Sequence, residues 1–214
     1  MKKILKFVIP CALLSVAIIC MNKAYATDRP KEAPEKMALK DYQHSKHISS
    51  KDGKQLYQIS QFTSNSSVET STFFFRVYES KRPQDIINSA SKTVSELLIP
   101  TDEKLWFILN RNNPEGLIFT NDQEPIRMGG ENRSKDLYKI YQSIIQSNVE
   151  QMKEIAYFEF EGQGLFLVTH EKGEEVYASE GASFILGVPS GEKLTSNEVI
   201  LKMKERILAF QSEK

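Results

Sequence analysis

Histidine is the side chain that most often exchanges protons near neutral pH, and the chain contains three: His44, His47 and His170. His44 and His47 are three residues apart, so a helix would place both rings on one side, as a metal site requires. Two ligands alone form a weak site, because zinc sites take three or four protein ligands. Both residues also fall in a segment that we expect to be a tether. We therefore predict a solvated pair and no metal site.

His170 ends a predicted strand and is followed by Glu171. A serine hydrolase would hold this ring beside a serine on a sharp turn, with an acid behind the ring. The sequence Gly-x-Ser-x-Gly that builds such a turn does not occur in the chain. We therefore expect no catalytic residue, and we keep a small secreted hydrolase that uses His170 with nearby acids as the alternative.

The segment Arg127–Lys135 (RMGGENRSK) combines three cations, paired glycines and the start of a predicted helix. Accessible glycine amides and a helix N-terminus both favour an anion such as phosphate or carboxylate. The residues of this candidate anion site are Arg127, Gly129, Gly130, Arg133, Ser134 and Lys135. It is no P-loop, because the Gly-Lys-Ser/Thr ending is absent. The simpler interpretation, which we favour, is a polar turn in which Glu131 and Asp136 neutralise the arginines.

Two further patterns admit both a functional and a structural interpretation. In the aromatic run Phe73–Tyr78 (FFFRVY), strand alternation puts Phe74 and Tyr78 on the face opposite Phe75. We favour a strand buried on both faces, whereas an exposed aromatic pair would mark a surface for a lipid or a partner. Glu159 and Glu161 share one face of another predicted strand, and such a pair is usually a solvated face rather than an acid–base couple.

Hydrophobic periodicity divides the first half of the folded chain into strands and one helix. Pro83 suits the first turn of a helix whose apolar stripe runs from Ile86 to Leu98, and Pro100 follows its end. Strands are expected at 56–61, Phe73–Tyr78, Leu105–Leu109 and Leu117–Thr120.

The second half has two helices around a series of strands. An apolar stripe from Leu137 to Met152 predicts a helix with Ser134 as its N-cap, and Thr195 with Glu198 forms a capping box for the last helix. Strands are expected at Ile155–Glu161, Leu165–His170, Glu175–Ala178 and Ser183–Val188.

Strands in runs, with helices between and after them, predict an α+β fold with a largely antiparallel sheet and three helices packed on one face. We expect a single α+β domain over 54–214, with two lobes that divide near residue 120 as the alternative. The preceding segment, 27–53, is polar and rich in charge, which predicts a flexible tether with at most a short helix around Glu35–Tyr42.

The first 26 residues have the pattern of a cleaved export signal. Lysines at the start precede the apolar run Phe7–Met21, and Ala24-Tyr25-Ala26 supplies the small residues of a cleavage site. Lipidation at Cys20 is disfavoured, because Ile18-Ile19 precede it instead of a small residue. The only cysteines, Cys11 and Cys20, lie within the signal, so the mature chain has neither disulfide nor thiolate chemistry.

The composition limits the classes of function further. The signal holds four lysines and no acid, which leaves 24 basic against 28 acidic side chains in the mature chain. This mildly acidic balance does not favour nucleic-acid binding, and no later segment is long and apolar enough to span a membrane. We expect an exported, non-catalytic protein of the periplasm or the medium, which binds a partner protein or a small ligand and needs no cofactor.

Overall fold

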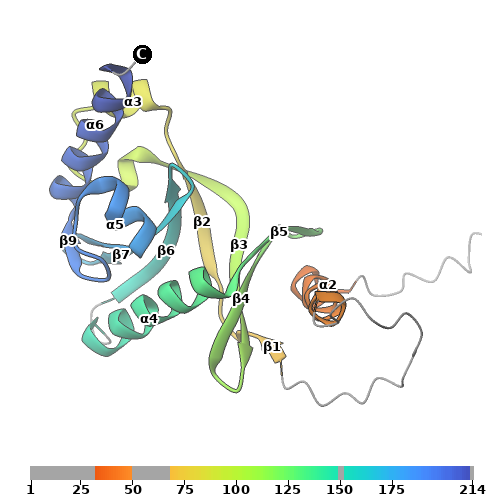
Figure 1. The fold of residues 1–214 in the computed structure, drawn as a ribbon. Coiled ribbons are helices and arrows are strands. Elements are labelled where there is room, and N and C mark those ends of the chain that lie inside the picture. Colours follow the sequence, from red (N-terminus) through yellow and green to blue (C-terminus); the bar gives the residue numbers. More distant parts are fainter. Residues whose placement is uncertain (1–31, 50–67, 149–151, 213–214) are drawn as a thin grey trace, which may run out of the picture. The chain divides into compact units, whose positions relative to one another are not determined.

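The computed structural model describes residues 32–49, 68–148 and 152–212, and the fold below is that of the compact unit Ala33–Lys214 (Figure 1). The predicted signal, the predicted strand at 56–61 and the expected domain boundary at residue 54 lie outside the described residues. The helices are α2 (Pro34–Ser49), α3 (Pro83–Asn88), α4 (Glu131–Asn148), α5 (Glu180–Leu186) and α6 (Ser196–Ser212). The strands are β1 (Val68–Thr70), β2 (Phe75–Ser80), β3 (Leu98–Asn110), β4 (Asn113–Thr120), β5 (Pro125–Gly129), β6 (Met152–Phe160), β7 (Gln163–His170), β8 (Glu174–Ala178) and β9 (Lys193–Thr195).

All nine strands belong to one sheet, in the order β5-β4-β3-β2-β6-β7-β8-β9, with β1 also paired to β3. The pair β2–β6 at the centre is parallel, and every other pair among the described strands is antiparallel. The prediction of an α+β fold with a largely antiparallel sheet is therefore confirmed.

Alternation along the strands builds a hydrophobic core on each face of the sheet. One face packs against α4, and we call this cluster the α4 core; it includes Phe75, Leu105, Phe107, Leu117, Phe119, Leu137, Ile140, Ile144, Tyr157, Phe166 and Tyr177. The opposite face packs against α3, α5 and α6, and this α6 core includes Ile86, Leu97, Phe158, Leu165, Leu167, Val176, Leu186, Val199 and Met203. Helices therefore cover both faces, and the expectation that they share one face is wrong.

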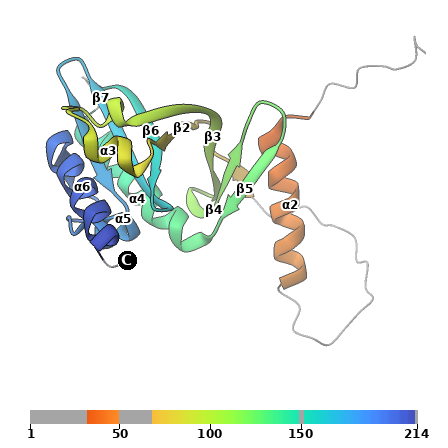
Figure 2. The same ribbon diagram turned by 90° about the horizontal axis from the view of Figure 1, so that it is seen from above.

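The helix α2 lies within the segment expected to be a tether, and it is longer than the short helix considered at 35–42. Figure 2 shows α2 beside β4 and β5, with α3 and α6 at the other end of the sheet. Ala38 is buried between Ile108 and Ile118 in a third, small cluster. Tyr42 packs over Gly116, where a Cβ atom would lie 3.2 Å from its ring. The Tyr42 hydroxyl donates to the carbonyl of Glu115 at 3.0 Å.

The described chain contains five α-helices rather than three, and one of the additional helices replaces a predicted strand. Residues 183–186 belong to α5, because Ser179 caps this helix by accepting a hydrogen bond from the Ala182 amide. Gly187, with a φ of 64°, ends it in the left-handed conformation. Local capping here outweighs the alternating pattern from which a strand was expected.

Two other helix boundaries differ from the predictions. The helix that starts at Pro83 ends at Asn88, because Ser89 is extended, and Leu98 already belongs to β3. The helix α4 begins at Glu131, so the expectation that Ser134 is its N-cap is wrong. Ser134 lies buried in the first turn and donates to the carbonyl of Glu131. The Thr195 cap of α6 is confirmed, since its hydroxyl accepts from the Glu198 amide at 3.3 Å.

Candidate functional site

The residues of the predicted anion site lie at the end of β5 and in the first turn of α4, and their cations already have acidic partners. Arg127 and Arg133 both donate to Oε1 of Glu159, at 2.8 and 2.7 Å. Lys135 donates to Glu131 at 2.6 Å. An anion would therefore have to compete with these carboxylates, and anion binding at this segment stays a prediction.

The two glycines of the segment differ in their packing. Gly129 pairs with Leu117 across β4 and β5, and a Cβ atom on Gly129 would lie 3.0 Å from the Leu117 side chain. Gly129 is thus needed for close strand packing. Gly130 has open space around it, and its carbonyl accepts from the Ser134 amide in the first turn of α4.

A pocket of about 420 Å³ lies close to this segment, where β2 and β6 end on the face of the sheet that carries α4. Along these strands the alternate side chains change from buried apolar residues to acids: Phe75 and Val77 precede Glu79, and Tyr157 precedes Glu159. The polar side chains that line the pocket are Glu79, Ser80, Glu103, Arg127, Glu159 and Glu161. The parallel register sets Glu79 directly beside Glu159.

A bulge in β3 delivers a further acid, Glu103, to this pocket. Between two regular pairs of β2 and β3, the single residue Val77 opposes residues 101–103. The hydroxyl of Thr101 bridges the gap: it donates to the carbonyl of Val77 at 2.7 Å and accepts from the Glu103 amide at 3.1 Å. Bulges commonly redirect a side chain in this way.

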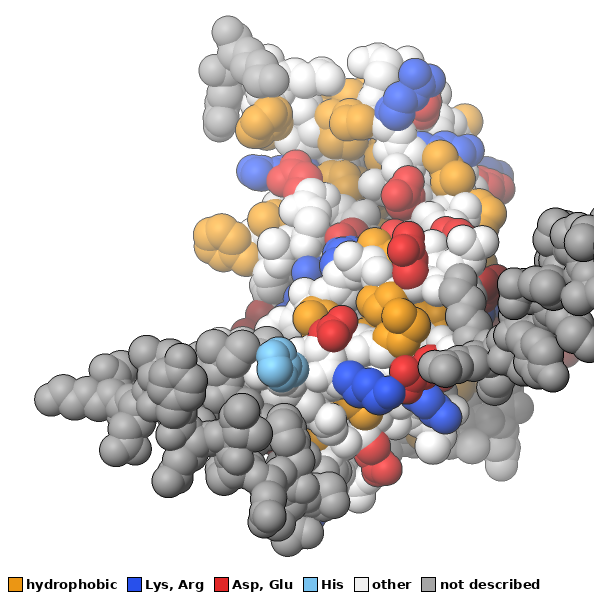
Figure 3. Space-filling model, turned by 90° about the vertical axis from the view of Figure 1, so that its right-hand side faces the viewer, with side chains coloured by type: hydrophobic (Ala, Val, Ile, Leu, Met, Phe, Trp, Pro, Cys, Tyr) orange, Lys and Arg blue, Asp and Glu red, His pale blue; other side chains and the backbone are white. Residues whose placement is uncertain are grey.

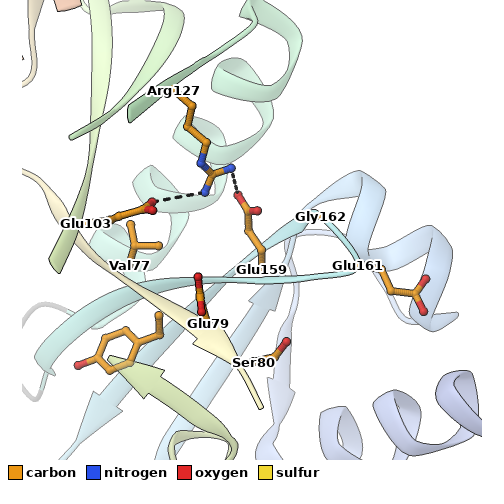
Figure 4. Close-up of a pocket in the computed structure, with 9 residues that line it drawn as sticks. Val77, Glu79, Ser80, Glu103, Arg127, Glu159, Glu161 and Gly162 are labelled. Atoms are coloured by element: carbon orange, nitrogen blue, oxygen red, sulfur yellow. Dashed lines mark hydrogen bonds and ion pairs between the residues drawn. The ribbon is translucent and has the colours of Figure 1, made fainter. Parts of the chain in front are cut away.

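Figure 4 shows the guanidinium of Arg127 between Glu103 and Glu159. It lies 2.8 Å from Glu159 but 3.8 Å from Glu103, and its central carbon sits 3.7 Å from the centre of the Phe119 ring. Glu159 also accepts from the Tyr157 hydroxyl at 2.9 Å. These bonds all reach Oε1, and no described residue donates to Oε2 of Glu159.

The charge of Glu103 is only partly compensated, by Arg127 at 3.8 Å. Its side chain is only 20% exposed, and its Oε2 atom is buried without a hydrogen-bond partner in the described structure. Burial raises the pKa of this carboxyl; the charge of Arg127 opposes the rise, and the charges of Glu159, Glu79 and Asp102 add to it. A cation placed beside Glu103 would relieve this cost.

Tyr157 forms the floor of the network below Glu159. Its ring is fully buried in the α4 core, and its hydroxyl also accepts a hydrogen bond from Arg133. Burial raises the pKa of this hydroxyl well above its ordinary value of 10.0, so Tyr157 stays protonated and donates to Glu159. Gly164 makes room for the ring, because a Cβ atom there would lie 2.7 Å from the hydroxyl.

His170 belongs to a different cluster, at β7, β8 and β9. Its Nε2 atom lies 3.4 Å from Glu175, which also accepts from Lys193 at 2.5 Å and from Tyr177 at 2.9 Å. Although burial opposes the effect, the hydrogen bonds from Lys193 and Tyr177 lower the pKa of Glu175. His170 lines neither of the two pockets described in this structure. His44 lies exposed on α2, and the side chain of His47 is outside the described residues.

Of the residues that line this pocket, the sequence analysis placed Arg127 in a candidate anion site. It interpreted Glu159 and Glu161 as a solvated face. Phe158 and Phe160 are indeed buried opposite, but Glu159 is only 21% exposed and pairs with both arginines. Glu161 instead lies in the turn after β6 and pairs with Arg206 of α6 at 3.1 Å. Glu79 carried no signal beyond an acid that follows the alternating Phe75 and Val77, and Glu103 carried none.

The exterior is mixed in character. On the described part of the face in Figure 3, acidic and basic side chains are interspersed with hydrophobic ones. No described helix combines the length and the hydropathy that crossing a bilayer requires. No group of three or more acid, histidine or cysteine side chains in the described chain is arranged to hold a metal ion.

Comparisons with protein-family models, with curated proteins and with solved structures found no match for this chain.

Proposed function

We propose that this chain is an exported, non-catalytic binding protein whose pocket at the ends of β2 and β6 accepts an ammonium or guanidinium group. The group is carried either by a small amine or by a lysine or arginine side chain of a partner protein. Export rests on the signal pattern of residues 1–26, and intact-mass analysis of exported protein should find Thr27 as the first residue.

The observation that carries the proposal is the incomplete compensation of Glu103. Its buried oxygen lacks a hydrogen-bond partner, and the nearest cation, Arg127, is held closer to Glu159. Leaving a buried charged group unsatisfied costs free energy, which a donor in the pocket would recover.

The neighbouring acids support the same ligand. Glu79 and Glu159 stand side by side on adjacent strands, an arrangement that like charges disfavour. The Oε2 atom of Glu159 accepts from no described residue. A cation with several N–H donors would contact these carboxylates simultaneously and reduce their mutual repulsion.

The alternative, a small hydrolase, rests on the contact between His170 and Glu175. That carboxylate also binds Lys193 and Tyr177, and none of these residues lines the acidic pocket. The binding function therefore has the stronger support.

Titration calorimetry at low salt tests the proposal with methylguanidinium, n-butylammonium and short peptides that contain one lysine or one arginine. Matched peptides with norleucine in place of the basic residue serve as ligand controls. We expect saturable binding of the cations, weakened about ten-fold or more in Glu103→Gln, since a charged partner is lost. Glu205→Gln, which changes an exposed acid of α6, should bind as the unmodified protein does.

The two sources of the cation give different results in this experiment. A preference for peptides indicates a protein partner, and tighter binding of the free amines indicates a small ligand. Absence of binding by every cation at millimolar concentration, or equal binding by Glu103→Gln and Glu205→Gln, would overturn the proposal.

A further inference from the structure

A strip of the sheet on the face opposite α4 carries one exposed aromatic side chain, Phe74, beside the partly buried Tyr78 and Trp106. On that face α2 packs over β3 and β4, and the α6 core begins at β2 and extends to β9. Between them lie five residues that we call the aromatic strip. They are Phe74, which precedes β2, Arg76 and Tyr78 of β2, and Lys104 and Trp106 of β3. Phe74 is 43% exposed, so the expectation that the aromatic run is buried on both faces is wrong.

The aromatic rings of the strip are held in place. The ring centres of Phe74 and Trp106 are 5.0 Å apart at an interplanar angle of 44°. The indole of Trp106 is fixed by its hydrogen bond to Thr120 at 3.1 Å. Lys104 lies 5.3 Å from the centre of the Phe74 ring. An exposed ring beside a fixed indole provides a firm surface on which a flat ligand can pack.

A second hollow, of about 200 Å³, lies beside the strip and is lined by polar side chains together with Val77 and Pro100. Arg76, Tyr78 and Lys104 reach it from the strip. Thr101, Asp102 and Glu103 reach it from the bulge, and Asp122 reaches it from the turn after β4. Apolar rings beside a small number of convergent polar groups are the usual composition of a small-molecule site.

The charges of this region are close to balance. Lys104 pairs with Asp122 at 2.5 Å, and Arg76 lies 3.8 Å from Glu154. A phosphate-bearing ligand requires cations without such partners, and a peptide with large apolar side chains does not match the polar lining. A neutral ring with many hydroxyl groups fits both features: its C–H face packs on the aromatic rings, and its hydroxyls bond to paired acids and bases.

We infer that the aromatic strip and the adjoining hollow form a binding site for a neutral saccharide. The hollow has room for about one sugar ring, and the open strip lets an oligosaccharide continue past Phe74. This site does not use the acid pair Glu79 and Glu159, although Val77, Tyr78 and Glu103 line both hollows.

The test uses Trp106, the only tryptophan of the chain, as a fluorescent reporter within the strip. The mature protein is titrated with neutral oligosaccharides of glucose, N-acetylglucosamine, mannose and galactose in both α and β linkages. We expect a saturable change of the emission with at least one of them. An oligothymidylate of eight nucleotides should cause no such change.

Two phenylalanine variants distinguish binding at the aromatic strip from nonspecific binding to exposed rings. Phe74→Ala should weaken saccharide binding about three- to ten-fold through the lost ring contact. Phe184→Ala removes a ring on α5 that is 88% exposed, and it should leave the affinity unchanged. Glu79→Gln, a change in the acidic pocket alone, should also leave it unchanged, which separates this test from that of the proposed function.

Three results would overturn the inference. They are the absence of a saturable response to every saccharide of the panel, an equal loss of affinity in both phenylalanine variants, and a response to the oligonucleotide but not to the sugars.

Discussion

At the scale of single residues, Glu103 is the place where the charge of the acidic pocket affects stability. Its pKa is raised above 4.5 in the fold, mainly by burial, so the folded chain holds this proton more tightly than the unfolded chain does. Glu103 therefore contributes most to the stability of the fold at pH values below its ordinary pKa of 4.5. This contribution falls as the pH rises from the ordinary value through the raised pKa.

We predict that Glu103→Gln raises the free energy of unfolding at pH 7.5 by up to about 1 kcal/mol. The variant no longer buries a charge and is no longer repelled by Glu159 and Glu79, and these gains outweigh the lost attraction to Arg127. The gain should vanish below about pH 4, where the carboxyl is neutral in both states. Urea denaturation at the two pH values measures both effects. A variant that is less stable at pH 7.5 would show instead that the contact with Arg127 stabilises the fold.

Gly164 is a second residue whose role is steric. The Tyr157 hydroxyl near it is held by Glu159 and Arg133, so the ring cannot easily move away from an added methyl group. We predict that Gly164→Ala lowers the free energy of unfolding by roughly 1–3 kcal/mol, the usual cost of overpacking. Gly173→Ala is the matched control, since nothing lies within 4 Å of a Cβ there. Equal stability of both variants would contradict the fixed position of Tyr157.

Residue types in the segment Arg127–Lys135 indicated correctly that its cations would be neutralised, but neither acid expected to pair with the arginines does so. Glu131 pairs with Lys135, whereas both arginines pair with Glu159, which is 32 and 26 residues away in the chain. Asp136 instead accepts from the Glu180 amide. Nearby partners can be proposed from spacing, and distant ones depend on strand order, which periodicity does not determine.

At the scale of elements, the predicted and observed helices differ mainly where a helix cap sets the boundary. The apolar stripes of α4 and α6 were long enough to identify both helices. The short helix α5 could not be identified in this way, because its buried residues Ala182 and Leu186 fit a buried strand as well as a helix. The capping serine four residues before Ser183 was the available signal.

We predict that Ser179→Ala lowers the free energy of unfolding by about 1 kcal/mol through loss of the bond to the Ala182 amide. Ser179→Asp should retain most of the stability, since a carboxylate at this position also caps a helix. Thermal unfolding followed by circular dichroism compares the three proteins. If the alanine and aspartate variants lose the same amount, the cap contributes little and burial of α5 alone holds it.

At the scale of the whole molecule, the fold class and the meander β6–β7–β8 followed from alternation and from the Gly-rich turns between the strands. The parallel pair β2–β6 could not be predicted in this way, because α3, β3, β4, β5 and α4 lie between its two strands in the chain. That pair joins the two halves of the sheet, and it also sets Glu79 beside Glu159. The site that was least visible in the sequence therefore depends on a long-range pairing that local patterns do not specify.

The α4 core decides whether the two halves unfold together. It combines Phe107 and Leu117 of β3 and β4 with Tyr157 and Phe166 of β6 and β7, so neither half keeps this core alone. We therefore predict one cooperative transition in urea, with the fluorescence of Trp106 in β3 and the far-ultraviolet circular dichroism of all elements changing at the same midpoint. Gly164→Ala, a change in β7, should shift both signals equally. If Trp106 kept its midpoint while the dichroism shifted, the first half would be a separate lobe, as the sequence alone left open.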